Sequence, residues 1–427
     1  MNFLEELAAR RRFGMKPGLE TIRSICAALD DPQLKFKAIH VAGTNGKGAV
    51  CAILDAALRA ASRREQGTGN GGRGLRVGRY TSPHLVRINE RFFLDGAPVD
   101  DMTLERIAEK VGRKTEDGSR EVTFFEALTA VAFELYAEAK VDYAILECGL
   151  GGRLDATNVC DPAVCVITKI GLDHCDWLGD TVGKIAAEKA GIIKPGVPVV
   201  LGRNEPDAIE VVRRRAQEVA APFHYAPDLA DESEIPAGFS LLGSFNRENA
   251  VTALATLKIL SEVNPTLTPD PSSLIPSCVI WPGRFQRVGN IIIDGAHNPP
   301  AARALRESLE DLEGLEGFNL ICGFCGDKDV VEVLSILKPL VRRGYAVRTN
   351  NPRSLPAEET AAKMRAAGID AVACESLKEA IRLSAHSTKH QAPRTLICGS
   401  LFLAGEALVE LDAYPWGRSR FDPSESL

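Results

Sequence analysis

The sequence of 427 residues contains no run of about eighteen apolar residues, the length that a membrane-spanning helix requires. Neither sign of charge dominates, because 51 Lys and Arg stand against 57 Asp and Glu, for a formal net charge of -6. This balance gives no reason to expect nucleic acid or an anionic membrane as a partner. The first residues, MNFLEELAARRRF, lack the apolar core of a signal peptide. We therefore expect a cytoplasmic protein that does not bind membranes.

The 11 cysteines form no framework. Their odd number and irregular spacing are typical of reduced thiols in the cytoplasm. Cys322 and Cys325 form one CxxC, but no second pair is present to complete a zinc site. We interpret this pair as core packing beside a turn rather than as a metal or redox site.

The pattern of apolar runs predicts two α/β domains. Runs rich in β-branched residues alternate with helical patterns, which is typical of βαβ units on a mostly parallel sheet. Pro282 and Gly283 interrupt this pattern, so we place a domain boundary near Gln286 and expect domains at 1–286 and 287–427. The glycine-rich stretch 65–74 indicates a flexible loop. The expected strands cover 37–42, 142–147, 163–170, 290–294, 318–324, 345–350 and 394–399.

The stretch VAGTNGKGAV follows the first expected strand and precedes a helical pattern. A general phosphate-binding loop has four residues between its first glycine and the Gly-Lys pair, followed by Ser or Thr. Here only two residues separate Gly43 from Gly46, and Gly48 and Ala49 follow Lys47. The glycines allow positive φ angles and a close approach of backbone amides to phosphate at a helix N-terminus. We therefore predict a nucleotide site rather than a plain strand-to-helix turn.

The residues after Lys47 cannot supply the hydroxyl that usually holds Mg²⁺ in such a loop. Other ligands stand at the ends of later strands: Glu147 ends one, and Asp173 and His174 follow another. The carboxyl ends of parallel strands face the ligand crevice, so Lys47, Glu147 and His174 can converge there. Taken singly, Glu147 is also consistent with a turn carboxylate and His174 with a helix cap. Together with the loop they indicate a site for Mg²⁺ and phosphate.

The stretch GDTVGKIAAEKAGIIKPG predicts a helix that is capped by Asp180 or Thr181 and ends near Ala190. Lys189 then lies in the last turn, where a cation interacts favourably with the helix dipole. From this segment alone, that electrostatic explanation is preferred over a catalytic role.

Eight motifs occur in order between His40 and Asp329: HVAGTNGKG, RYTSPHLVRINER, ECGLGGRLDATN, ITKIGLDHCDWLG, AAEKAGI, WPGRFQ, DGAHNP and CGDKD. With GMKPGLE, which begins at Gly14, and CGSLFLAGE, which ends at Glu406, the likeness covers nearly the whole chain. This set closely resembles the dihydrofolate synthase and folylpolyglutamate synthase family, a branch of the Mur ligases, and most of all its bacterial bifunctional members. The resemblance implies a Mur-ligase-like P-loop ATPase domain with a parallel-rich sheet, which also binds pterin or folate. A smaller Rossmann-like α/β domain, which binds glutamate, would follow it. The implied activity is ATP-dependent addition of L-glutamate to dihydropteroate and to reduced folates through an acyl phosphate.

The resemblance also implies roles for individual residues. ATP is expected at Gly43, Thr44, Asn45, Gly46, Lys47, Gly48, Asn249, Arg284 and Asp294. Mg²⁺ is expected at Ser82, Glu147 and His174. The resemblance is also compatible with a second ion, either Mg²⁺ or K⁺. The pterin or folate is expected at Thr81, Ser82, Pro83, His84, Arg153 and Asp155, and glutamate at His297 and Ser400. The expected catalytic residues are Lys47, Lys189 and His297, and Lys189 matches a lysine that the family often carries as a carbamate.

Two departures from the family pattern are present. Ala49 stands where the family usually has Ser, and Phe245 and Asn246 stand where it usually has HQ. The alternatives are an enzyme with folylpolyglutamate activity only, a Mur ligase that extends a peptidoglycan precursor, a nucleotide-driven switch, and a non-catalytic relative. The motifs TSPHLVR and WPGRFQ favour folate, and DGAHN and GSLFLAGE exceed what a switch requires. The family leads us to expect a monomer.

Overall fold

The computed structural model describes residues 18–67, 74–115, 122–264, 275–313, 317–326, 329–385 and 394–417. Gly14, most of the stretch 65–74 and part of the motif CGDKD lie outside these residues. Two compact units make up the chain. The first contains Met1–Phe239, Glu248–Val279 and Arg418–Leu427, and the second contains Ser240–Arg247 and Ile280–Gly417. Which substrate each part of the chain binds remains a prediction.

The first unit is built on an eight-stranded sheet with the order β4-β3-β2-β5-β1-β6-β7-β8. The six strands from β2 to β8 in this order are parallel, and β3 and β4 add an antiparallel edge. The strands are β1 (Lys37–Ala42), β2 (Val77–Tyr80), β3 (Phe92–Leu94), β4 (Ala97–Pro98), β5 (Tyr143–Glu147), β6 (Pro162–Ile167), β7 (Val199–Leu201) and β8 (Phe223–Tyr225).

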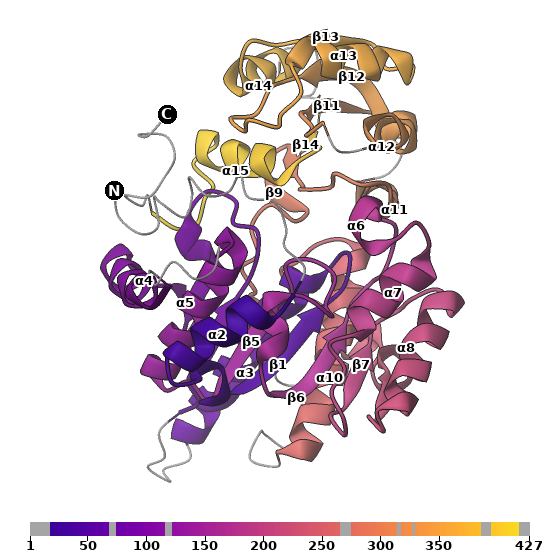
Figure 1. The fold of residues 1–427 in the computed structure, drawn as a ribbon. Coiled ribbons are helices and arrows are strands. Elements are labelled where there is room, and N and C mark those ends of the chain that lie inside the picture. Colours follow the sequence, from indigo (N-terminus) through magenta and orange to yellow (C-terminus); the bar gives the residue numbers. More distant parts are fainter. Residues whose placement is uncertain are drawn as a thin grey trace. The chain divides into compact units, whose positions relative to one another are not determined.

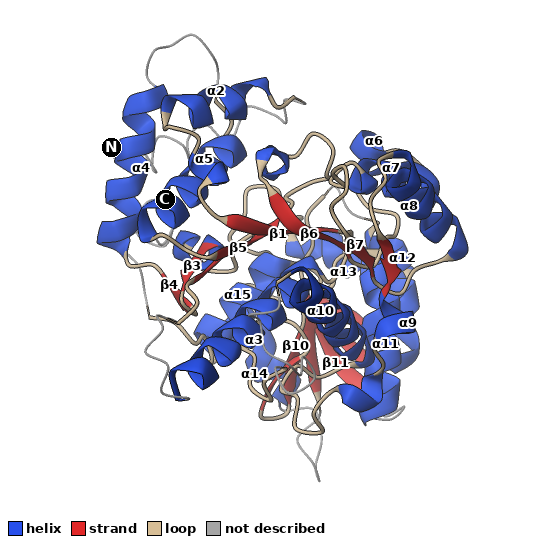
Figure 2. Ribbon diagram, turned by 90° about the horizontal axis from the view of Figure 1, so that it is seen from below, coloured by secondary structure: helices blue, strands red, loops and turns tan. Residues whose placement is uncertain are grey.

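Helices cover both faces of this sheet. Figure 2 shows α2, α4, α5, α7 and α8 on one side of the row of strands, and α3 and α10 on the other. Ala144 and Leu146 of β5 are buried against α2 and α5, whereas Asn264, just after α10, bonds the Tyr143 hydroxyl from the opposite face. The helices are α2 (Glu20–Ala28), α3 (Lys47–Gly67), α4 (Asp101–Thr115), α5 (Phe124–Ala139), α6 (Cys175–Leu178), α7 (Val182–Ala190), α8 (Pro206–Glu218), α9 (Ala226–Leu229) and α10 (Ser244–Val263), with 3₁₀ turns η2 (Pro32–Leu34), η3 (Ile88–Arg91), η4 (Ala156–Val159) and η5 (Glu232–Glu234).

The second unit is a smaller α/β layer structure, drawn in orange and yellow in Figure 1. Its six-stranded sheet has the order β13-β12-β11-β14-β10-β9 and is parallel except for β9, which runs antiparallel to β10. The strands are β9 (Gln286–Val288), β10 (Ile291–Ile293), β11 (Phe318–Cys322), β12 (Val341–Ala346), β13 (Ala371–Ala373) and β14 (Thr395–Cys398). The helical elements are α11 (Pro299–Glu313), α12 (Val330–Leu337), η7 (Lys338–Leu340), α13 (Ala357–Ala366), α14 (Leu377–Ala385) and α15 (Leu401–Glu410).

The predicted α/β class with parallel-rich sheets is confirmed, and β1 covers the predicted residues. β12 lies at Val341–Ala346 rather than at 345–350. The exposed Arg342 and Arg343 follow its first residue, and these two charges obscure the start of the strand in the sequence. The strands β2, β3, β4, β7, β8, β9 and β13 were not predicted. Each has only two to four residues, too few to show a clear alternation of apolar and polar side chains.

Cys322 and Cys325 carry free thiols, and both residues are buried. The Cys322 sulfur lies 3.5 Å from the Met364 sulfur, so the structure agrees with core packing for this residue.

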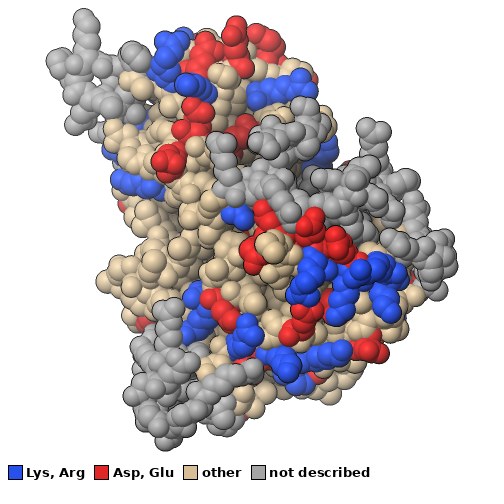
Figure 3. Space-filling view, turned by 90° about the vertical axis from the view of Figure 1, so that its left-hand side faces the viewer, with Lys and Arg blue, Asp and Glu red and all other residues tan. Residues whose placement is uncertain are grey.

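None of the helices in the described part of the chain combines the length and apolar character that crossing a membrane requires. On the face drawn in Figure 3, basic and acidic side chains are interspersed. Ion pairs such as Arg106 with Glu138 join α4 to α5.

Candidate active site

The loop between β1 and α3 depends on two glycines with positive φ angles. Gly43 has a φ of +154° and Gly46 a φ of +88°, which L side chains rarely adopt. A Cβ at Gly43 would overlap the Thr168 side chain, and one at Gly46 would overlap the amide of Asn249. The predicted nucleotide residue Asn249 therefore lies directly against the loop.

The residues that follow β6 hold this loop in place. The backbone N–H groups of Thr44 and Asn45 donate to the Lys169 carbonyl at 2.8 and 3.1 Å. The Thr168 hydroxyl donates to the Asn45 carbonyl at 2.7 Å, and the Thr44 hydroxyl lies 3.0 Å from the Gly171 carbonyl. With the loop fixed, the first amides of α3, which have no partner within a helix, form the anion-binding terminus that a phosphate needs.

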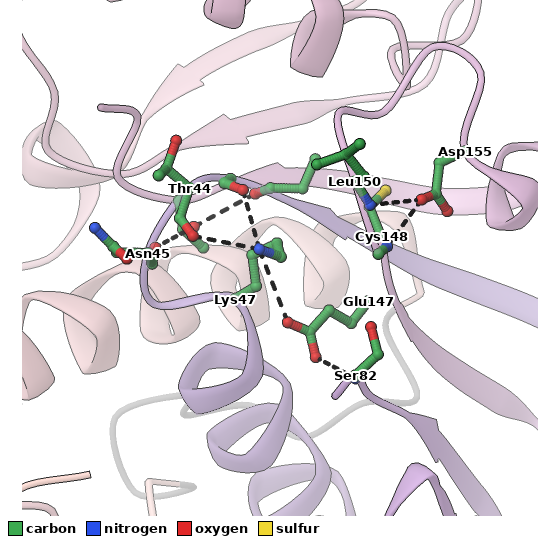
Figure 4. A network of polar contacts seen from close by, with 12 residues as sticks. Thr44, Asn45, Lys47, Ser82, Glu147, Cys148, Leu150 and Asp155 are labelled. Atoms are coloured by element: carbon green, nitrogen blue, oxygen red, sulfur yellow. Dashed lines mark hydrogen bonds and ion pairs between the residues drawn. The ribbon is translucent and has the colours of Figure 1, made fainter. Parts of the chain in front are cut away.

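Lys47 and Glu147 meet at the mouth of this loop (Figure 4). The Lys47 Nζ donates to the carbonyls of Gly43 and Thr44 at 3.1 and 3.3 Å and lies 4.0 Å from the Glu147 Oε1. Glu147 is buried at the end of β5, and its Oε2 accepts a 2.9 Å hydrogen bond from the Ser82 N–H. Three residues predicted from separate motifs, Lys47, Ser82 and Glu147, thus come together.

Lys189 also reaches the phosphate loop. It is buried near the end of α7, and its Nζ donates to the Gly43 carbonyl at 2.8 Å. Burial, reinforced by the positive charge of Lys47, lowers the pKa of Lys189 to about 7. The predicted helix start is confirmed, since the Thr181 hydroxyl caps α7 by accepting from the Lys184 N–H. A dipole interaction alone does not explain a lysine that is buried against the loop.

His174 occupies the position before the short helix α6, with a positive φ of +52°, but its side chain makes no capping hydrogen bond to that helix. Its side chain is 42% exposed, and its Nε2 lies 3.9 Å from the Asp173 Oδ1. Within the described ranges, no three His, Cys, Asp or Glu side chains form a group that could hold a metal. The predicted metal set draws one ligand from the Ser82 hydroxyl. Its Ser82 and Glu147 members are adjacent. The His174 backbone N–H donates to the Asp173 Oδ1 at 2.9 Å.

Asp155 organises the loop that follows Glu147. Its Oδ2 accepts from the N–H groups of Gly149 and Leu150 at 2.8 and 2.9 Å, and its Oδ1 accepts from the N–H and hydroxyl of Thr157 at 3.0 and 2.6 Å. Burial raises the pKa of the Asp155 carboxyl, although these hydrogen bonds oppose the shift. The contacts of this predicted pterin-site residue therefore shape the backbone of the loop.

The same loop docks on α7. The Arg153 N–H donates to the Glu188 carbonyl at 2.8 Å, and the Arg153 Nη2 lies 2.9 Å from the Glu188 Oε1. The Asn158 amide donates to the Gly191 carbonyl at 3.2 Å. The Arg153 side chain is more than half exposed. Arg153, predicted at the substrate site, thus connects its loop to the helix that carries Lys189.

The TSPHLVR segment leaves the sheet edge after β2. Thr81 is buried, and its N–H donates to the Arg91 carbonyl at 3.1 Å. Ser82 joins Pro83 through a cis peptide bond. The His84 Nδ1 accepts from the Arg91 Nε at 2.9 Å, which requires an unprotonated Nδ1 and leaves the ring proton on Nε2. The predicted substrate residues of this segment therefore sit on a loop whose two ends are joined.

Asp294 in the second unit also bonds to backbone. Its Oδ2 accepts from the Phe285 N–H at 2.8 Å and its Oδ1 from the Ala296 N–H at 2.7 Å. Burial raises the pKa of Asp294, and the positive charge of Arg284 opposes this shift. Phe285 has a positive φ of +49°, and its hydrogen bond to Asp294 holds the turn that follows Arg284.

His297 and Ser400 follow β10 and β14, which are parallel neighbours, so both lie at the same edge of the sheet. The His297 Nδ1 lies 2.8 Å from the Gly295 carbonyl, so Nδ1 donates and, in a neutral ring, Nε2 is the proton acceptor. The Ser400 hydroxyl caps α15 by accepting from the Leu403 N–H at 3.0 Å.

The residues that depart from the family pattern have packing contacts. Ala49 is buried in the first turn of α3. The Phe245 ring lies 6.2 Å from the Phe285 ring, and the buried Asn246 donates to the Leu242 carbonyl at 2.7 Å.

Sequence reasoning missed two residues that support the predicted loops. Asn204 is buried, its Oδ1 accepts from the Ile170 N–H at 2.7 Å, and its amide donates to the Thr168 carbonyl at 3.0 Å. It thereby steadies the segment that holds the phosphate loop. Glu90 has a similar role after β2, described below. An Asn at a strand end and a Glu in a turn are both common for other reasons, so neither stands out in a sequence.

Comparisons with known proteins agree with the family that the motifs indicate. A model of the Mur ligase glutamate ligase domain matches residues 283–401. The dihydrofolate synthase/folylpolyglutamate synthase of Bacillus subtilis is 34% identical over 382 residues, covering 82% of this chain and 85% of that protein. The Escherichia coli FolC structure in complex with DHPP and ADP has a TM-score of 0.83 and 30% identity, covering 97% of this chain and 98% of that one. A bifunctional enzyme from Yersinia pestis, complexed with AMPPNP and a Mn ion, has a TM-score of 0.82 and 29% identity, with coverages of 96% and 98%.

Proposed function

The chain belongs to the dihydrofolate synthase/folylpolyglutamate synthase family, and we propose that it adds L-glutamate to dihydropteroate and to reduced folates at the expense of ATP. It is an ATP-dependent carboxylate-amine ligase. The convergence of Lys47, Glu147 and Ser82 on one phosphate loop is the observation that carries the proposal. A nucleotide loop with an adjoining carboxylate and hydroxyl is what phosphoryl transfer with a divalent metal requires.

The residues at this loop fit Mg²⁺. Magnesium prefers hard oxygen ligands, and the hydrogen bond between Glu147 and the Ser82 N–H places a carboxylate and a hydroxyl-bearing residue side by side. We assign Ser82, Glu147 and His174 to the metal. When bound, Mg²⁺ neutralises charge on the phosphates of ATP. Lys47 contributes a second positive charge at the same loop.

The reaction proceeds by two transfers. A carboxylate oxygen of the pterin substrate attacks the γ-phosphorus of ATP, which forms an acyl phosphate and releases ADP. The amine of glutamate then attacks the acyl carbon, a C–N bond forms, and inorganic phosphate leaves while the nitrogen loses a proton. The contribution of Lys47 is electrostatic, since it offsets the negative charge of the γ-phosphoryl group as it is transferred.

Lys189 has the properties of a residue that reacts with CO₂. A pKa of about 7 leaves a large neutral fraction at physiological pH, and a neutral amine can add to CO₂ to give a carbamate with loss of one proton. The product is an anion on a side chain that already reaches the Gly43 carbonyl. We therefore include carbamylated Lys189 in the proposed active form.

We assign glutamate to the second unit, where His297 and Ser400 share one sheet edge. The His297 Nε2 is the acceptor nitrogen of a neutral ring, which suits it to take the proton of the glutamate amine. Asp294 and Arg284 belong to the same unit, and we assign them to ATP binding. The 11 free cysteines are typical of a reducing compartment, so we propose a cytoplasmic enzyme. From the family resemblance we also propose that it works as a monomer.

The proposal is tested by mass spectrometry of pterins after incubation with Mg²⁺-ATP, glutamate and either dihydropteroate or a reduced folate monoglutamate. One added glutamyl group on each substrate is expected. Addition to only one substrate would restrict the enzyme to a single activity, and addition to neither would refute the proposal. Lys47→Ala should lose product formation. The matched variant Lys184→Ala, which removes an exposed lysine of α7 paired with Asp180, should retain it.

A further inference from the structure

The segment between β2 and β3 is a closed loop. Tyr80 pairs with Phe92 in the antiparallel ladder, and the Thr81 N–H donates to the Arg91 carbonyl one step further. Residues 82–90 therefore leave the sheet edge and return to it. At the first residue of the loop, the Ser82 N–H is held by the Glu147 carboxylate.

A second buried carboxylate holds the middle of this loop. The Glu90 Oε2 accepts from the Leu85 N–H at 2.8 Å, and its Oε1 accepts from the N–H groups of Val86 and Arg87 at 2.8 and 2.7 Å. Three consecutive amides thus surround one carboxylate, and Glu90 is only 7% exposed. Hydrogen bonds to an ionised carboxylate are shorter and stronger than those between neutral groups.

We propose that Glu90 is a positioning residue of this enzyme: by binding three successive amides it fixes the loop 82–87, so that Ser82 is held against Glu147 for metal binding and His84 faces the pterin substrate. This inference rests on the proposed function. Glu90 needs no contact with any substrate to act in this way. Its effect passes through Ser82 at one end of the loop and through His84, which Arg91 orients, in the middle.

The geometry requires a carboxylate of this length. A glutamine would keep one acceptor oxygen but would direct its NH₂ group toward the Leu85 N–H, so that two donors would face each other. An alanine would remove all three acceptor contacts. A residue that only capped the turn η3 would affect stability and all substrates alike, whereas a positioning residue should affect metal and pterin without affecting glutamate.

The test compares Glu90→Gln and Glu90→Ala with the wild type and with Asp95→Asn. Asp95 is a matched control because its Oδ1 also accepts a backbone N–H, that of Val77, at the opposite end of β2 from Ser82. Three quantities are measured for each variant: the melting temperature, the affinity for Mn²⁺ in the presence of AMPPNP by electron paramagnetic resonance, and the KM values for pterin and glutamate.

We expect Glu90→Gln to weaken Mn²⁺ binding and to raise the pterin KM by about tenfold or more, the usual effect of removing a group that orients metal ligands. The melting temperature of Glu90→Gln should fall, because the buried Leu85 N–H loses its acceptor, but the glutamate KM should match the wild type. Asp95→Asn should match the wild type in Mn²⁺ affinity and in both KM values. Unchanged Mn²⁺ affinity in a folded Glu90→Gln protein would overturn the inference, as would equal changes in both KM values. The Mn²⁺ measurement needs no turnover, so it remains decisive even if the wild type adds no glutamate. If Glu90→Ala does not fold, Glu90→Gln alone decides.

Discussion

The predicted site residues make different kinds of contact at the carboxyl edges of the two sheets. In the first unit, Lys47 lies near Glu147, Glu147 binds Ser82, and Lys189 reaches the Gly43 carbonyl, so residues from different strands contact each other's loops. In the second unit, Asp294, His297 and Ser400 bond to backbone groups two to nine residues away in the chain. A motif residue can therefore supply a reacting group or give a loop its shape. At the second sheet, the contacts of these residues mainly shape loops.

The largest effect is expected from breaking the backbone of the phosphate loop. Gly46→Ala places a side chain at a φ of +88° and against the Asn249 amide. Strain of this kind costs roughly 1–3 kcal/mol, so the KM for ATP should rise by about fivefold to a hundredfold. Gly183→Ala is the matched control. Gly183 lies in α7, and the nearest atom to a Cβ there would be in the Val211 side chain, at 3.9 Å. An unchanged ATP KM in Gly46→Ala would show that this loop does not hold the nucleotide.

A second, pH-dependent effect is expected from Lys189→Met in CO₂-free buffer. The pKa of Lys189 falls from 10.5 to about 7 in the folded chain. Between these values the unfolded chain binds more protons than the folded one, so wild-type stability rises with pH across this window. Below pH 7 the buried charge is present and destabilises the protein.

Lys189→Met removes that charge. The gain in the free energy of unfolding over wild type should therefore be largest near pH 6 and shrink toward pH 10, as urea denaturation can measure. A gain that does not vary with pH would contradict the buried, neutralised lysine. Added bicarbonate should raise wild-type activity and leave the variant inactive.

The smallest effect is expected in the second unit, from Ser400→Ala. This change removes the cap of α15, which typically costs about 1 kcal/mol of stability. If Ser400 serves only as a cap, Ser400→Asp should restore stability and the glutamate KM together. If it also binds glutamate, Ser400→Asp should restore stability alone, because a second carboxylate would repel the substrate. Thermal melting and glutamate saturation curves distinguish the two outcomes.

Some features could be read from sequence because they depend on local chemistry. The strand 37–42, the glycines of the phosphate loop and the Thr181 cap each depend on a few adjacent residues. Glu147 could be placed as well, since a strand end fixes the sheet edge at which its side chain lies. These predictions needed no knowledge of how distant segments pack.

Other features depend on contacts between distant segments. The role of Asn204 requires knowing that the end of β7 lies beside residues 168–170. The burial of Lys189 against Gly43 joins residues 146 positions apart. The three bonds of Glu90 are local, but a glutamate in a turn has many possible partners, and only the folded loop shows which amides face it.

The most direct test of the central claim follows oxygen atoms through the reaction. Dihydropteroate labelled with ¹⁸O in its carboxylate is incubated with Mg²⁺-ATP and glutamate, and the inorganic phosphate is analysed by mass spectrometry. An acyl phosphate requires one carboxylate oxygen to leave with phosphorus, so each phosphate released with an amide should carry one ¹⁸O. Phosphate without ¹⁸O, formed in step with glutamylated product, would contradict the account.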